Sequence, residues 1–99
     1  MALSATLVRR SRFVYADGAI REMVLWKLPR PTPERPHGFN YRLHYNSADG
    51  RATVRYDNET GKGDHRHFDD HEERYHFRNV EVLVDDFRDI DQVRRDRNP

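Results

Sequence analysis

The chain has 99 residues, which is enough for a single domain over 1–99 with one modest hydrophobic core. Its 18 Lys and Arg nearly balance its 17 Asp and Glu, and a net charge of +1 excludes nucleic-acid binding driven by bulk charge alone. The absence of cysteine excludes disulfides and thiolate metal sites, and the eleven percent of aromatic residues argues against disorder. We find neither a signal-peptide pattern nor a run of ~18 apolar residues, so we expect a cytoplasmic protein without membrane contact.

Apolar and polar residues alternate with a period of two over the first three quarters of the chain, as is typical of β-strands. Asp17-Gly18 and the SADG stretch at 47–50 are turn signals between apolar runs. The prolines of 29–38 exclude a central strand or a helix there, so we predict a proline-rich connection, or alternatively a ligand for a partner groove. The expected strands cover 5–15, 20–28, 39–46, 52–57 and 72–77.

From Asn79 onward the apolar residues follow the period of a helix. Asn79 is a suitable N-cap, and the apolar stripe that follows includes Leu83 and Phe87. We predict a helix over 80–95 and a frayed tail at 96–99. The expected fold class is therefore α+β, an antiparallel four- to five-stranded meander with one C-terminal helix packed on one face.

Two of the predicted strands have an apolar face, which includes tyrosines, and a polar face. On the polar face, Arg42 and His44 of one strand are expected beside Arg55 and Asp57 of the next. Arginine presents a planar fork of donors that suits phosphate, so we assign these four residues to substrate binding. Gly61 and Gly63, in the following stretch, are assigned to the same role because backbone N–H groups around glycines can form an anion nest.

Residues 57–67, DNETGKGDHRH, hold more potential chemistry than any other stretch of the chain. His65 and His67 can exchange protons near neutral pH, and Asp64 can orient one of them. Lys62 and Arg66 can stabilise charge that develops on phosphoryl oxygens. This combination predicts acid–base cleavage of a phosphodiester without a cofactor, and RNA is the expected substrate because its own 2′-hydroxyl is the nucleophile.

Two other interpretations of this stretch stay open. His65 and His67 share a face of an extended segment, so they could bind a metal ion and support a metal-dependent nuclease. The stretch could also be an ion-rich turn with idle histidines. Further metal ligands would come from His71, Asp69, Asp70 or Asp64.

The stretch YDNETGKGDHRH at 56–67, after YRLHY at 41–45 and DGAIREMVLWKLP at 17–29, resembles the TumE-like family of small bacterial toxin components. The resemblance spans nearly the whole chain. It implies a growth-inhibiting toxin of a type II toxin–antitoxin module, with a cognate DNA-binding antitoxin as partner. It implies no catalytic residues, so the roles above rest on the sequence alone. The matching positions are Tyr56, Asp57, Asn58, Gly61, Lys62, Gly63, Asp64, His65, Arg66 and His67.

The sequence therefore predicts an RNA-cleaving toxin. The alternative, from another class of function, is a non-catalytic toxin or interaction protein that acts only by binding a macromolecule. A homodimer formed by pairing of edge strands is also compatible with so short a meander, although the prolines could block one edge.

Overall fold

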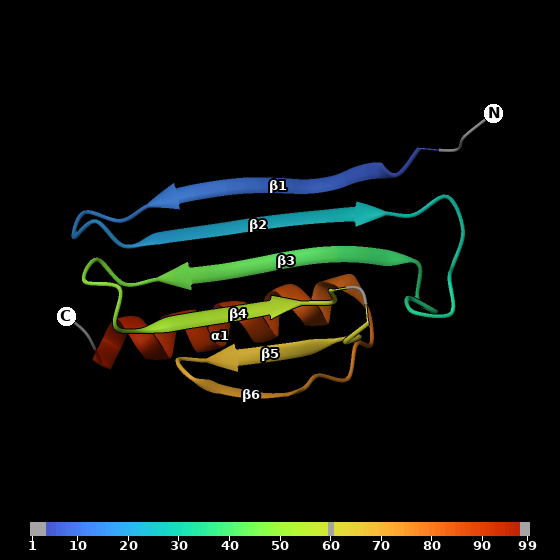
Figure 1. Ribbon diagram of the computed structural model, residues 1–99. Helices are drawn as coiled ribbons and strands as arrows, with labels where there is room; N and C mark the ends of the chain where they lie inside the picture. The colour runs from blue at the N-terminus through green and yellow to red at the C-terminus, as the bar shows by residue number, and fades with distance from the viewer. Residues whose placement is uncertain (1–3, 60, 98–99) are drawn as a thin grey trace.

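The computed structural model describes residues 4–59 and 61–97, and the side chains of the helix as far as residue 92. Six strands form one antiparallel sheet in which every strand pairs with its neighbours in the chain, and one helix crosses one face (Figure 1). The expected antiparallel sheet with one C-terminal helix is confirmed, but the expected count of four to five strands is wrong. The elements are β1 (Thr6–Val14), β2 (Ile20–Lys27), β3 (Phe39–Asn46), β4 (Thr53–Asp57), β5 (His65–Phe68), β6 (His71–Arg74) and α1 (Val80–Arg97).

The strand that the sequence does not reveal is β5, which the prediction leaves inside a glycine-rich loop. Arg66 occupies a position on the helix side of β5, where an apolar residue would mark the alternation. Its guanidinium lies over the rings of Tyr56, Phe68 and Tyr75, at 5.1 to 5.9 Å from their centroids. Because a charged residue that packs on aromatic rings occupies this inward position, the hydrophobic periodicity of the sequence does not indicate a strand here.

The last strand also differs from its prediction, because β6 covers 71–74 instead of 72–77. The last pair of the ladder is His65 with Arg74, and the Tyr75 N–H still donates to the Asp64 carbonyl at 3.1 Å, one position beyond it. Tyr75 is buried although it lies outside a strand.

The hydrophobic core lies between α1 and the sheet face that carries the tyrosines of β3 and β4. Tyr45, Tyr56 and Phe87 are among the fully buried side chains of this core. The Val82 N–H donates to Asn79 Oδ1 at 2.8 Å, which confirms the predicted N-cap. The helix continues to Arg97, beyond the expected end at 95, so the frayed tail predicted for 96–99 is helical at 96–97 and otherwise lies outside the described residues.

The outer edge of the sheet is formed by β1, and four large hydrophobic residues there are exposed by 42% to 52%. The strand also carries Arg9, Arg10 and Arg12 at its centre. If two copies paired through antiparallel β1 strands, arginines would face one another in the central registers, and like charges at facing positions are destabilising. The homodimer by strand pairing stays a prediction, and this distribution of charge opposes it. The exposed residues are Leu7, Val8, Phe13 and Val14.

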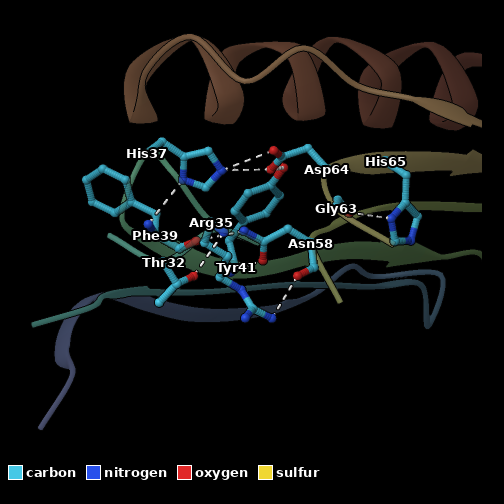
Figure 2. Close-up of polar contacts among 9 residues, drawn as sticks. All are labelled: Thr32, Arg35, His37, Phe39, Tyr41, Asn58, Gly63, Asp64 and His65. Carbon is cyan, nitrogen blue, oxygen red and sulfur yellow. Dashed lines mark hydrogen bonds and ion pairs between the residues drawn. The ribbon is translucent and has the colours of Figure 1, made fainter. Parts of the chain in front are cut away.

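Asn58, directly after β4, fixes the end of that strand against β3 and the proline-rich connection. Its Oδ1 accepts from the Tyr41 N–H at 3.1 Å, and its Nδ2 donates to the Phe39 carbonyl at 2.7 Å. Its own carbonyl accepts from Arg35 Nη2 at 2.8 Å (Figure 2). Because Asn58 is only 1% exposed, water does not substitute for these partners.

We predict that Asn58→Ala destabilises the fold strongly. The substitution removes two hydrogen bonds and leaves the Tyr41 N–H buried and unpaired, which lowers the free energy of unfolding by about 2–4 kcal/mol. Urea denaturation measures this change as a lower midpoint. Asn46→Ala, at the exposed end of β3, serves as the control and is expected to change stability by less than about 0.5 kcal/mol. Equal midpoints for the two variants would contradict the role of Asn58.

Candidate functional site

The sheet face opposite α1 brings together side chains from β3, β4 and β5. His44 lies opposite Arg55, and Arg55 lies opposite His67 on the next strand. One rung further on, Arg42 lies opposite Asp57. The common polar face that the sequence predicts for β3 and β4 is therefore present, and β5 adds imidazole groups to it.

His65 and Asp57 form a buried pair on this face. The Nε2 atom of His65 lies 2.5 Å from Asp57 Oδ1. Its Nδ1 lies 2.9 Å from the Gly63 carbonyl oxygen, as Figure 2 shows. Since a carbonyl only accepts, Nδ1 carries a proton and donates it to Gly63. The ring is only 3% exposed, so it is held from both sides and is closed to solvent. This geometry suits a residue that positions its neighbours, whereas the sequence suggests an accessible proton carrier.

His67 is the more accessible histidine of β5. Arg55 Nη2 donates to its Nε2 at 3.0 Å, which places the ring proton of the neutral imidazole on Nδ1. Burial lowers the pKa of His67 and the positive charge of Arg55 lowers it further, while Glu72, 3.6 Å away, opposes the shift. His67 is therefore neutral at neutral pH, with its Nε2 lone pair held by a guanidinium.

His44 shares the surroundings of His67. Burial is the main cause that lowers the pKa of His44, and Arg42 and Arg55 lower it further, against the opposing effect of Glu22. His44 and His67 line one hollow of about 250 Å³ together with both arginines. Two imidazoles and two guanidinium groups thus face a common space.

Lys62 stands at the rim of this group. Its Nζ lies 3.6 Å from Glu72 Oε1, and the side chain is exposed. Gly61 and Gly63 have φ values of 85° and 72°, a left-handed conformation that favours glycine, so the turn depends on both residues. The Lys62 N–H donates to the Glu59 carbonyl within the turn. An anion nest at the two glycines stays a prediction.

Arg66 does not lie with the histidines. It alternates with them along β5 and projects from the helix side of the sheet, where Nε lies 2.7 Å from Glu73 Oε1 and Nη1 donates to the Tyr56 hydroxyl at 3.2 Å. Side chains alternate between the two faces of a strand, so Arg66 lies on the face opposite His65 and His67. This placement opposes the expectation that Arg66 holds a ligand beside them. Its observed contacts are with Glu73 of β6 and with aromatic rings of the helix side.

The sequence suggests that Asp64 orients His65 or His67, but the histidine that its carboxylate contacts is His37 of the proline-rich connection. His37 Nε2 lies 3.0 and 3.1 Å from the two Asp64 oxygens, and the Tyr41 hydroxyl donates to Oδ1 at 2.6 Å (Figure 2). The Phe39 N–H donates to His37 Nδ1, so His37 carries its proton on Nε2. Burial and the Asp64 carboxylate raise the pKa of Tyr41. Asp64 thus joins the motif to the connection, a contact between segments too distant in sequence to predict.

His65, His67 and Glu72 could hold a metal ion, because one ligand atom from each lies within 4.8 Å of the others. Sequence reasoning missed Glu72, which the pairing of β6 with β5 brings opposite His67. The site already holds positive charge, since Arg55 donates to His67 Nε2 and Lys62 contacts Glu72. A metal ion would have to displace both cations. Of the described residues, the other expected ligands lie outside this group: His71, Asp69, Asp70 and Asp64.

Comparison with known families gives a match between residues 4–96 and the family model described as Toxin TumE. The chain belongs to this toxin family. The match includes all six strands and nearly all of α1, and it confirms the resemblance carried by the YDNETGKGDHRH stretch of this TumE-family protein. No curated protein and no solved structure matches the chain. Of the described helical residues, none form a segment long and apolar enough to span a membrane.

We predict that Asp64→Asn lowers the free energy of unfolding by about 1–2 kcal/mol. The amide replaces hydrogen bonds to a charged carboxylate with weaker neutral ones at Tyr41 and His37. Asp70→Asn, which neutralises an exposed carboxylate at the β5–β6 turn, is the matched control. Urea denaturation of both variants tests the prediction, and indistinguishable midpoints would show that Asp64 does not anchor the motif.

Proposed function

We propose that this protein is the toxin of a type II toxin–antitoxin module and that it inhibits growth by cleaving RNA. The observation that supports this most directly is the hollow shared by His44, His67, Arg42 and Arg55. Two imidazoles supply an acid and a base, and two guanidinium groups supply donors for a phosphate. The proposed partner is a DNA-binding antitoxin, in keeping with membership of a toxin family.

The phosphate of the scissile bond binds between Arg42 and Arg55. Arg42 is exposed and, among the side chains described at 4–59 and 61–92, no carboxylate forms an ion pair with it, so its donors are available. Arg55 donates to His67 in the free protein. When Arg55 turns to the phosphate, it releases the Nε2 lone pair of His67.

The reaction then needs only two proton transfers. His67 Nε2 takes the proton of the 2′-hydroxyl, and the 2′-oxygen attacks the phosphorus. The bond from phosphorus to the 5′-oxygen breaks, and protonated His44 gives its proton to that leaving oxygen. The products are a 2′,3′-cyclic phosphate and a 5′-hydroxyl, and the two arginines stabilise the charge on the phosphoryl oxygens during the transfer.

His65 has a positioning role in this proposal, in place of the proton exchange that the sequence suggests. It is buried against Asp57, and its ring lies 5.1 Å from that of His67, centroid to centroid. Asp57 also lies 3.1 Å from Arg55 Nε. The pair of Asp57 and His65 therefore supports the two residues that touch the substrate. Lys62 stays at the rim, within reach of an adjacent phosphate.

We predict that His67→Ala abolishes most RNA cleavage without unfolding the protein. Loss of a general base lowers such a rate by about 10²- to 10⁴-fold. Purified protein is incubated with total RNA, and the products are resolved on a denaturing gel. His71→Ala, which removes an exposed histidine of β6, is the control and is expected to cleave as the wild-type protein does.

Two other outcomes of this experiment would favour other functions. Growth inhibition that persists in His67→Ala would indicate a toxin that acts by binding alone. Cleavage that stops in the presence of a chelator would indicate a metal-dependent nuclease at His65, His67 and Glu72.

The pH dependence gives a separate prediction. Both His44 and His67 have pKa values below the ordinary 6.5, so both limbs of the kcat/KM profile fall below that pH and the maximum lies on the acidic side of it. A bound phosphate anion raises both pKa values, so the maximum of kcat lies at higher pH. Initial cleavage rates measured across the acidic and neutral range test this. A kcat/KM maximum in the alkaline range would exclude these two histidines as the catalytic pair.

A further inference from the structure

Three hollows on the sheet face opposite α1 meet at Arg42. The first, of about 250 Å³, is the one that Arg42 shares with the histidines. The second, of about 490 Å³, extends from Arg42 past Asn40 toward Arg35. The third, of about 290 Å³, lies between Arg42, Val24 and Trp26. Because Arg42 lines all three, the hollows adjoin one another, and we call this row of hollows, from Val24 and Trp26 of β2 to His67 of β5, the groove.

Trp26 lies at the far end of this groove from the histidines. It belongs to β2, opposite Asn40 of β3, and its side chain is only half-buried although it is the one tryptophan of the chain. The guanidinium carbon of Arg10 lies 6.0 Å from its ring centroid. A large aromatic ring with a cation over it therefore lies on the polar face, away from the core that buries the tyrosines.

The spacing of the groove suits a chain of nucleotides. His44 lies four residues beyond Asn40 along β3, which corresponds to ~14 Å, and three strand spacings from β2 to β5 add ~14 Å across the sheet. The diagonal from Trp26 to His67 is therefore roughly 20 Å. Arg42 and Arg55 lie along that diagonal, so phosphate-binding groups occur between the aromatic end and the imidazole end.

We propose that this groove binds single-stranded RNA, with one base stacked on Trp26 and the backbone phosphates at Arg42 and Arg55. The proposal rests on the proposed function, since it names the substrate form that the histidine hollow would receive. A single strand is selected because only an unpaired base can leave its neighbours and offer a face to an indole ring. In duplex RNA the bases stay stacked on one another, so no base face is available to Trp26.

The experiment measures binding apart from cleavage. The ligand is a short fluorescein-labelled 2′-O-methyl RNA strand, which the proposed reaction cannot cleave because its 2′-oxygen carries no proton. Wild-type protein is expected to bind the single strand and to bind the matching 2′-O-methyl duplex at least tenfold more weakly, as measured by fluorescence anisotropy. Quenching of the single tryptophan by an unlabelled strand reports directly on contact between a base and Trp26.

Three variants locate the contact. Trp26→Ala is expected to weaken binding by about 5- to 150-fold, which corresponds to the loss of one stacked base. Trp26→Phe keeps an aromatic face and is expected to retain most of the affinity. If both variants lose affinity and also unfold at a lower midpoint, the loss reflects a damaged fold, and the assignment of base stacking to Trp26 is overturned. Phe13→Ala, which removes an exposed aromatic ring from the helix side of β1, leaves the affinity unchanged.

The outcomes separate this inference from the proposed function. If Trp26→Ala binds as wild-type protein does, or if the duplex binds equally well, the groove does not recognise single strands, even where natural RNA is cleaved. If binding depends on Trp26 but natural RNA is not cleaved, the inference about the groove holds and the proposed acid–base mechanism is wrong.

Discussion

The pairing of β4 with β3 on one side and β5 on the other is the constraint on which the rest of the structure depends. A shift of one residue in either ladder would move every side chain of the shifted strand to the opposite face. His44, Arg55 and His67 stand in one row only because both ladders keep this register. Asn58 and Asp64 stabilise it from the ends of the strands, through hydrogen bonds to β3 and to the proline-rich connection.

The motif that carries the family resemblance places side chains on both faces of the sheet. His65 and His67 project to the polar face, whereas Arg66 between them packs on aromatic rings of the core. Gly61 and Gly63 allow the turn that returns the chain to the sheet. A run of polar residues that looks like one reactive loop thus contributes side chains both to the core and to the polar face.

The sequence predicts the parts of this arrangement that depend on local alternation. The tyrosines of YRLHY and of β4 identify the buried face, so Arg42, His44, Arg55 and Asp57 are placed correctly on the other. Contacts that depend on register between distant segments escape prediction, as with Glu72 beside His67 and His37 beside Asp64. The sequence does not single out Trp26 for a different reason. An aromatic residue in a strand is typical of the core, and only the structure shows which face of the sheet it occupies.

The order of the elements, with α1 after all six strands, affects when the protein can fold. Its Leu83 and Phe87 are fully buried against a sheet that is otherwise complete by residue 74. Until those residues leave the ribosome, the tyrosines of β3 and β4 have no cover, and a domain of this size folds as a unit. A nascent chain therefore contains His44, Arg55 and His67 before it has the folded surface, and it acquires that surface only after α1 has also been synthesised.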